Sequence, residues 1–269
     1  MTKIKGKCVL ITGGASGIGK IMGRMSLERG AKNLVIWDIN EANILSTVSE
    51  LEPLGRVSGY RVDVSNSESV LAMAEKTRQE CGNVDILINC AGIVANNATF
   101  DKQSITDIER TMKINATAPM VVANCFMPSM MERNCGHVCN IASAAGMISN
   151  PKMSVYAASK WAVIGWSDSV RIELKQMKSK VRFTTIAPYF INTGMFDGVK
   201  SRFFPILKPE PTACKILNSI ERNRNFKGIP FSYHFIRFCQ ALLPTSIFDF
   251  IFGEVVGIFH AMDNFTGRK

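Results

Sequence analysis

The sequence has none of the cysteine and histidine patterns from which zinc sites and disulfide frameworks are built. Its eight cysteines are scattered, mostly inside apolar runs, with no Cys-x-x-Cys pair, and its three histidines do not cluster. Such a distribution is typical of reduced thiols in a cytosolic protein and argues against a metal site. The cysteines are Cys8, Cys81, Cys90, Cys125, Cys135, Cys139, Cys214 and Cys239.

Long apolar segments are also missing. The first residues, Met-Thr-Lys-Ile-Lys-Gly-Lys, contain no apolar signal region, so secretion through a cleaved peptide is not expected. In the carboxyl-terminal region the longest uncharged run, residues 238–248, has eleven residues and contains Pro244. A helix that spans a bilayer needs about 20 apolar residues. We therefore expect a cytoplasmic protein that does not cross a membrane.

The composition is that of a chain able to fold as one large domain, or as one domain with an extension. Of its 269 residues, 46% are hydrophobic and 20% are charged, so wholesale disorder is not expected. Lysines and arginines exceed acidic residues by ten, and residues 200–269 contribute half of this excess. A basic surface suits nucleic acid, an anionic membrane or an anionic cofactor.

A glycine cluster near the amino terminus follows a short strand and opens a helix. Residues 8–12 are apolar and β-rich, the glycine cluster occupies residues 13–19, and a helical pattern continues to Gly30. Glycines let the backbone turn tightly and approach a pyrophosphate, whose charge the free N–H groups of a helix amino terminus stabilise. We predict that a dinucleotide contacts Gly13, Ser16, Gly17, Ile18 and Gly19.

A second apolar strand, residues 33–38, ends in Asp38, nineteen residues after Gly19. At this spacing an acidic residue accepts hydrogen bonds from the adenosine ribose hydroxyls. Its charge would also repel a 2′-phosphate, and Gly14, Ala15 and Ser16 offer no basic side chain to bind one. NAD is therefore predicted over NADP. The alternative is that Asp38 only caps the following helix.

Strands and helices alternate along most of the chain. Further strands are predicted at residues 56–62, 84–90, 137–143 and 181–187, and helices at residues 40–54, 66–80, 104–131 and from Tyr156 to about residue 178. This alternation indicates a Rossmann-like α/β fold, a doubly wound parallel sheet of about seven strands in a three-layer α/β/α arrangement. We assign residues 1–200 to an NAD-binding catalytic core and residues 201–269 to a hydrophobic, basic carboxyl-terminal extension of the same domain.

Tyr156 and Lys160 stand four residues apart on a predicted helix, so their side chains lie on one face. A lysine ammonium at this distance favours the phenolate and lowers the tyrosine pKa from about 10, and an oxidised nicotinamide would act in the same direction. Ser143, at the end of a predicted strand, can bind an alcohol or carbonyl oxygen while Tyr156 moves the proton. Taken alone, a Tyr-x-x-x-Lys pair is more often an ordinary helical pair.

Asn115 interrupts an apolar helical stretch just before Pro119. Its amide must bond to a neighbouring turn or hold a water at a site, because an unpartnered buried amide costs about 1 to 3 kcal/mol. Pro119 favours a local break in the helix, which would free backbone groups for such a water. After the last of these strands, residues 188–196 form a loop suited to cover a nicotinamide and its substrate.

Taken together, these residues resemble the short-chain dehydrogenase/reductase family over roughly residues 5–200. The matching positions, in the family's order and approximate spacing, are Thr12-Gly-x-x-x-Gly17-x-Gly19, Asp63, Asn89-x-Ala91-Gly92, Asn115, Ser143, Tyr156-x-x-x-Lys160, Pro188 and Thr193. The resemblance implies that Tyr156 is the acid and base and that Lys160 lowers its pKa and binds the nicotinamide ribose. It also implies that Ser143 positions the substrate oxygen and that Asn115 holds a water. Cofactor contacts are implied for Asp63, Val64, Asn89, Ala91, Gly92, Tyr156, Lys160, Pro188 and Thr193.

Two positions depart from the family pattern. Cys90 replaces a frequent asparagine, and we expect this change to weaken a structural hydrogen bond without affecting catalysis. Tyr189 replaces a frequent glycine. With Tyr189, residues 188–196 are similar to the branch that includes retinol dehydrogenases and 17-beta-hydroxysteroid dehydrogenases, and so are residues 257–265. This likeness implies a lipophilic substrate. A homodimer or homotetramer, formed through the helices that carry Asn115 and Tyr156, is expected from the family.

The tail between residues 229 and 260 combines eight phenylalanines or tyrosines with three charged side chains, Arg237, Asp249 and Glu254. It can pack onto the domain or a second subunit, form a lid over a lipophilic substrate, or contact a membrane surface through an apolar face. The basic residues are not spaced around stacking aromatics, so nucleic-acid binding is not expected.

We predict an oxidoreductase that transfers a hydride between NAD(H) and a lipophilic alcohol or carbonyl compound, retinoid-, steroid- or long-chain-like, with Tyr156 as acid and base. Two alternatives stay open: a carbonyl reductase that works mainly in the reductive direction, and a non-enzymatic NAD-binding scaffold on the same fold. Retention of all four predicted catalytic residues argues against the scaffold. They are Asn115, Ser143, Tyr156 and Lys160.

Overall fold

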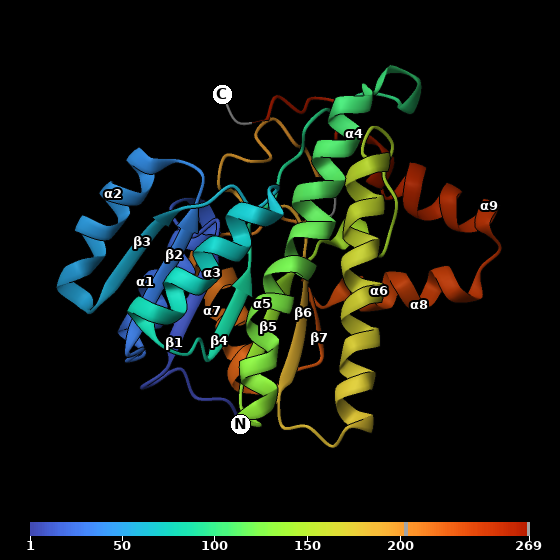
Figure 1. Cartoon of the computed structure of the whole chain (residues 1–269). Helices are drawn as coiled ribbons and strands as arrows, with labels where there is room; N and C mark the ends of the chain where they lie inside the picture. Colours follow the sequence, from blue (N-terminus) through green and yellow to red (C-terminus); the bar gives the residue numbers. More distant parts are fainter. Residues whose placement is uncertain (202–203, 268–269) are drawn as a thin grey trace.

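The structure, a computed structural model of the whole chain, describes residues 1–201 and 204–267. Within these residues seven parallel strands form one sheet in the order β3-β2-β1-β4-β5-β6-β7 (Figure 1). The strands are β1 (Cys8–Thr12), β2 (Asn33–Asp38), β3 (Val57–Arg61), β4 (Ile86–Asn89), β5 (His137–Ile141), β6 (Arg182–Pro188) and β7 (Phe226–Ile229). The order reverses between β1 and β4, and ligands of such sheets bind at the carboxyl ends of the strands beside this point. The predicted doubly wound parallel sheet is confirmed.

Helices cover both faces of the sheet. On one face pack α1 (Gly17–Glu28), α2 (Glu41–Leu51) and α7 (Pro209–Glu221), and on the other α3 (Ser67–Cys81), α5 (Ala118–Glu132) and α6 (Ser154–Gln176), which face the viewer in Figure 1. Along β1, Val9 and Ile11 point to the first face, whereas Cys8 and Leu10 point to the second. Because both faces of the central strands are buried, β1, β2 and β4 read in the sequence as nearly continuous apolar runs.

The predicted helix at residues 104–131 consists of three parts. They are α4 (Ile105–Met112), the π-helix η3 (Lys113–Thr117) and α5. Pro119, near the start of α5, has no N–H to donate to the preceding turn. The chain widens into a π-turn directly before it, so the break that Pro119 predicts is present. Asn66 caps the amino terminus of α3, since its side chain accepts a hydrogen bond of 3.1 Å from the N–H of Ser69.

The carboxyl-terminal elements lie beside β7 and the start of α6. They include α8 (Ser232–Leu242), α9 (Thr245–Phe248), the π-helix η5 (Asp249–Val255) and the short helix η6 (Ile258–His260). In Figure 1, α8 and α9 stand out from the body of the domain. Tyr233, Ile236, Phe248 and Ile258 are buried in the cluster that also contains Tyr156, so part of this tail packs onto the domain. Among the described residues, no helix combines the length and apolar character that crossing a membrane requires.

The remaining short helices are η1 (Glu52–Leu54), η2 (Phe100–Lys102) and η4 (Ala144–Gly146). All eight cysteines are free thiols, in agreement with the prediction from their scattered positions.

Candidate active site

A cavity of about 310 Å³ lies at the carboxyl ends of the strands, beside the point where the sheet order reverses. It is lined by nearly all of the residues that the sequence predicts for the site. These are Gly13, Ser16, Gly17, Ile18, Gly19, Asp38, Asp63, Val64, Ala91, Gly92, Ser143, Tyr156, Lys160, Pro188 and Thr193. Asn89 and Asn115 do not line the cavity.

The glycine turn after β1 is packed so tightly that larger residues do not fit. At Gly13, where φ is +67°, a Cβ atom would lie 2.9 Å from the Cα atom of Ala91, and at Gly19 it would overlap the carbonyl oxygen of Gly13. Thr12 fixes the turn to the loop after β4, because its Oγ1 accepts hydrogen bonds from the N–H groups of Cys90 (3.1 Å) and Ala91 (3.2 Å). The turn thus opens α1 with backbone N–H groups beside the cavity, an arrangement that fits a dinucleotide phosphate.

Asp38, at the end of β2, holds two turns with its carboxylate. Oδ2 accepts a hydrogen bond from the N–H of Ala15 and Oδ1 one from the N–H of Asn40, both at 3.1 Å. Asn40 is the amino-terminal cap of α2. The alternative that Asp38 caps the helix is therefore wrong: Asp38 accepts from the N–H of the capping residue, and it lines the cavity.

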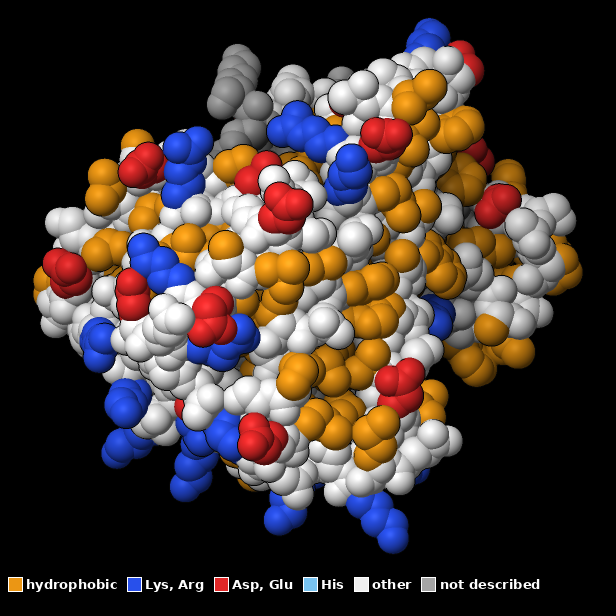
Figure 2. All heavy atoms as spheres, viewed as in Figure 1, with side chains coloured by type: hydrophobic (Ala, Val, Ile, Leu, Met, Phe, Trp, Pro, Cys, Tyr) orange, Lys and Arg blue, Asp and Glu red, His pale blue; other side chains and the backbone are white. Residues whose placement is uncertain are grey.

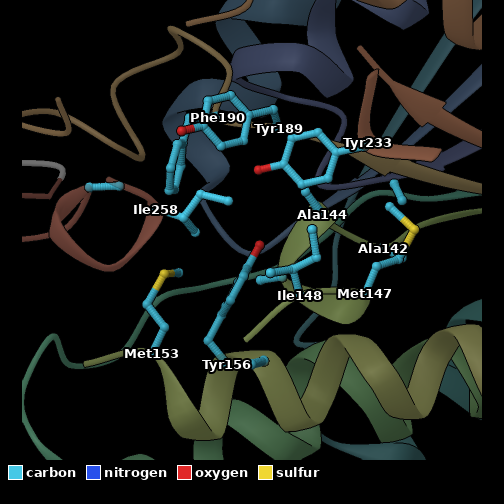
Figure 3. Packing of buried hydrophobic residues seen from close by; sticks show 14 of the residues in the cluster. Ala142, Ala144, Met147, Ile148, Met153, Tyr156, Tyr189, Phe190, Tyr233 and Ile258 are labelled. Atoms are coloured by element: carbon cyan, nitrogen blue, oxygen red, sulfur yellow. The ribbon is translucent and has the colours of Figure 1, made fainter. Parts of the chain in front are cut away.

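Ser143 lies two residues beyond the end of β5, at the cap of η4, where its Oγ accepts a hydrogen bond of 3.1 Å from the N–H of Ala145. Tyr156 rises from the first turns of α6, and its hydroxyl points toward the rings of Tyr189 and Tyr233 (Figure 3). The side chains of Ser143 and Tyr156 line the same cavity. The end of one strand and the start of one helix thus bring together two groups that can bind the same substrate oxygen.

Burial dominates the electrostatics of this pair. It raises the pKa of Tyr156 to about 12, and the hydrogen bond from Ser143 opposes the rise. Burial also lowers the pKa of Lys160 to about 8. The Lys160 Nζ lies 5.6 Å from the centre of the Tyr156 ring and donates a hydrogen bond of 3.1 Å to the carbonyl oxygen of Ile141. The lowered tyrosine pKa that the sequence predicts is thus not produced by the protein's own groups, because desolvation outweighs the ammonium charge.

The two asparagines outside the cavity form hydrogen bonds to segments close to it. Asn115 is fully buried in η3, and its amide accepts from the N–H of Ile93 and donates to the carbonyl oxygen of Ile93, both at 2.8 Å. Asn89 donates to the carbonyl oxygen of Pro119 at 3.2 Å and to Asn140 Oδ1 at 2.8 Å. Among the described residues Asn89 Oδ1 has no hydrogen-bond partner, and the contact of Asn89 with a nucleotide stays a prediction. Asn115 bonds to the neighbouring turn, which is one of the two alternatives that the sequence left open; the other is a bound water.

An apolar wall faces the Tyr156 hydroxyl. Three of its rings belong to residues 188–196, the loop that the sequence predicts to cover the nicotinamide and its substrate, and a fourth comes from the carboxyl-terminal extension. The ring of Phe196 lies edge-on to Tyr156 at 6.2 Å, and Phe190 packs against Phe196 at 5.0 Å. Tyr189 packs against Tyr233 of α8 at 5.3 Å. The rest of the cavity lining consists of Trp37, Ile39, Val62, Cys90, Ile93, Arg110, Ile114, Ile141, Ala142, Ala144, Ala145, Ile148, Asn150, Tyr189, Phe190, Ile191, Met195, Phe196 and Tyr233.

Comparisons with known proteins agree with this geometry. The pattern of the family described as short chain dehydrogenase matches residues 7–202. The chain is 34% identical to epidermal retinol dehydrogenase 2 of Mus musculus, over 99% of this chain and 87% of that protein. It is also 34% identical to estradiol 17-beta-dehydrogenase 11 of Pongo abelii, over 90% of this chain and 80% of that protein.

A solved short-chain dehydrogenase/reductase from Burkholderia phymatum in complex with NAD superposes with a TM-score of 0.81 at 26% identity, over 90% of this chain and 96% of that one. A glycine turn, a sheet-end cavity and a Ser-Tyr-Lys group on one parallel sheet define a nicotinamide-dependent oxidoreductase of Rossmann-like fold. The chain belongs to the short-chain dehydrogenase family. It is an enzyme of that family and acts on CH–OH groups.

Proposed function

We propose that this enzyme uses NAD to interconvert a lipophilic alcohol and its carbonyl compound, with Tyr156 as acid and base. The observation that carries the proposal is the position of the Tyr156 and Ser143 hydroxyls. Both line the same cavity as the glycine turn, and an apolar wall faces the phenol.

The cofactor fits the residues present. Gly13, Gly17 and Gly19 line the cavity, so the backbone of the turn is open to a pyrophosphate. Asp38 and Asp63 lie on the cavity wall where an adenosine would extend, and Lys160 lies beside Tyr156. When bound, the nicotinamide ring supplies the hydride acceptor or donor of the reaction. The negative charge of Asp38 supports NAD over NADP, because a 2′-phosphate beside it would be repelled.

Proton transfer falls to Tyr156. In the oxidative direction its phenolate takes the hydroxyl proton of the alcohol, and in the reductive direction the phenol donates a proton to the carbonyl oxygen. Ser143 holds that oxygen by a hydrogen bond. Lys160 places a positive charge 5.6 Å from the phenol ring, which favours the phenolate against the opposing effect of burial. Asn115 positions the loop at residue 93 rather than the substrate.

The apolar wall supports a lipophilic substrate. Tyr189, Phe190 and Phe196 present rings to the space in front of Tyr156, and Tyr233 adds a fourth from the carboxyl-terminal extension. Aromatic and aliphatic walls bind apolar molecules by excluding water from them. The names of the two mammalian relatives, a retinol and an estradiol dehydrogenase, agree with an alcohol of this kind.

We also propose a homodimer that forms through α5 and α6. Hydrophobic side chains gather over these two helices on the face shown in Figure 2. Trp161 and Ile172 of α6 are 42% and 47% exposed, which is unusual for large apolar residues unless a partner covers them. Sedimentation velocity tests this, and a Trp161→Glu, Ile172→Glu variant is expected to sediment as a monomer. A monomeric wild-type protein would contradict the proposal.

A substrate screen tests the function. The purified protein is mixed with NAD and, one at a time, retinol, estradiol, a long-chain secondary alcohol and ethanol, and the absorbance of NADH is followed. We expect turnover of at least one lipophilic alcohol and a much lower kcat/KM for ethanol, with NADP a poorer cofactor. Measurable NAD affinity without turnover of any alcohol or carbonyl compound would favour a nucleotide-binding scaffold instead. A rate that is much higher with NADH and a carbonyl compound would assign the reductive direction.

A further inference from the structure

Large apolar side chains are exposed together on the carboxyl-terminal projection. Between residues 231 and 255 lie eight of the nineteen large hydrophobic residues that are exposed in the described part of the chain. We call them the outer apolar face: Phe231, Phe235, Phe238, Leu242, Ile247, Phe250, Ile251 and Val255, with exposed fractions between 38% and 74%. Figure 2 shows hydrophobic side chains gathered on this projection, which Figure 1 identifies as α8 and α9. Scattered exposed hydrophobics need no explanation, but a contiguous group marks an interaction surface.

The spacing of the first four residues of the outer apolar face places them on one side of α8. Phe231 at the cap, and Phe235, Phe238 and Leu242 within the helix, follow each other at intervals of four, three and four residues. This is the spacing of one helical face. They are 74%, 63%, 60% and 66% exposed, in that order. A helix that presents such a face to water lacks the partner that its pattern implies.

The opposite side of α8 belongs to the active site. Tyr233 and Ile236 are each 2% exposed and pack in the cluster that contains Tyr156. Tyr233 also lines the cavity. The exposed face and the cavity wall are therefore separated by the thickness of one helix, about 10 Å.

We propose that the outer apolar face binds a lipid surface and places the cavity next to the phase in which a lipophilic substrate dissolves. Binding to lipid is inferred from the exposed face alone. The lipophilic nature of the substrate rests on the proposed function. No segment of this protein needs to cross the bilayer, because an apolar helical face can lie within the interface.

The chemistry of the face favours lipid over a second protein chain. Its eight side chains are phenylalanine, leucine, isoleucine or valine, and none of them can form a hydrogen bond. Interfaces between proteins carry about one hydrogen bond per 100 to 200 Å² and are enriched in Trp, Tyr and Arg at their centres. On α8 the tyrosine, Tyr233, is turned into the cavity wall instead. Lipid chains make no demand for hydrogen bonds, so a purely apolar face suits them.

The charges beside the face balance each other. Arg237 is exposed on α8, and the Lys227 Nζ lies 5.6 Å above the ring of Phe231. Against these stand Asp249 and the exposed Glu254, which is hydrogen-bonded to His260 at 3.0 Å. Two cations and two carboxylates give no strong attraction to anionic lipid. Binding is therefore driven by apolar contact, and it tolerates high salt because salt screens only the charge interactions.

Flotation with vesicles of neutral phosphatidylcholine tests the proposal on the full-length protein. The test variant is Phe235→Ser with Leu242→Ser, side chains that are 63% and 66% exposed. The matched control is Phe100→Ser with Leu45→Ser, which are 65% and 66% exposed but lie outside the projection. Wild type and control are expected to float with the vesicles in low and high salt. The test variant is expected to lose binding by at least about tenfold, because two apolar anchors are removed.

Three results would overturn the proposal: wild-type protein that stays unbound, a test variant that floats as well as wild type, or flotation only with anionic vesicles. Absence of flotation together with a mass that falls from dimer to monomer in the test variant would assign the face to a second copy instead. Turnover is measured separately with a short, water-soluble alcohol, for which the test variant is expected to match wild type. If no alcohol is turned over but flotation is intact, the proposed function fails and the lipid contact stands.

Discussion

The ammonium nitrogen of Lys160 lies 5.6 Å from the centre of the Tyr156 ring and is held there by a hydrogen bond of 3.1 Å to the carbonyl oxygen of Ile141. The end of β5 thus anchors the charge beside the ring. Burial raises the pKa of the phenol, and the Ser143 hydroxyl, which lines the same cavity, lowers it. A positive charge on Lys160 would favour the phenolate as well. The predictions that follow separate these contributions.

The rates of the two directions are expected to depend differently on pH. Burial raises the pKa of Tyr156 to about 12, so the phenol is protonated at neutral pH. Reduction, which needs the protonated phenol, should be nearly independent of pH around neutrality. Oxidation needs the phenolate, and its rate should rise by up to about tenfold per pH unit while pH stays below the pKa. Initial rates with saturating cofactor check this, and an oxidation rate that falls as pH rises through neutrality would contradict it.

Lys160→Met is expected to slow oxidation and to move its pH profile to higher pH by about one unit, because a positive charge near the phenolate is lost. Among the described residues Lys160 has no carboxylate partner that would be left unpaired, and its Nζ donates to a backbone carbonyl. Lys175→Met, at the exposed end of the same helix, serves as the control and should leave the profile unchanged. Equal profiles for both variants would show that the Lys160 charge does not act on Tyr156.

Ser143→Ala is expected to lower kcat by about 10² to 10³-fold, because the hydrogen bond to the reacting oxygen is lost. The variant also loses the group that opposes the raised pKa of Tyr156, so the oxidation profile should move to higher pH. Ser154→Ala, which removes an exposed hydroxyl at the start of α6, is the control. A Ser143→Ala enzyme with normal kcat would remove Ser143 from the mechanism.

Asp38→Asn tests the choice of cofactor. The amide oxygen can still accept from the N–H of Ala15, so the glycine turn should keep its shape while the negative charge disappears. The ratio of kcat/KM with NAD to that with NADP is expected to fall by about tenfold, since repulsion of the 2′-phosphate is relieved. Thermal unfolding of the variant shows whether the turn is intact. An unchanged ratio in a well-folded variant would mean that Asp38 only supports the turn.

The fold could be predicted from the sequence because its strands are buried on both faces. Uninterrupted apolar runs such as those of β1 and β2 identify their strands directly. The glycines between β1 and α1 indicate a tight turn that can approach a dinucleotide. The end of one strand differs from the prediction. The strand predicted to end at Ser143 ends at Ile141, because Ser143 leaves the sheet to cap η4.

The sequence predicted the site residues that belong to motifs. It did not single out the residues that reach the site only through the packing of distant segments. Spacing in the sequence identifies Tyr156 and Lys160, but burial, which sets the tyrosine pKa, depends on aromatic residues that arrive from distant segments. Tyr233 reaches the cavity from α8, 77 positions after Tyr156 in the chain, and no local pattern marks it. Asn89 fits the family motif, and its amide nitrogen donates to Pro119 and Asn140, which only the packing of β4 against its neighbours reveals.

The most direct test of the account is the turnover of Tyr156→Phe, measured together with its affinity for NADH. The variant keeps the ring that packs edge-on against Phe196 and removes only the hydroxyl, so the fold and the cofactor site should be preserved. We expect NADH to bind with nearly wild-type affinity, while oxidation of the best alcohol falls below detection. Oxidation at a rate near that of wild type would contradict the central claim that this phenol carries the proton.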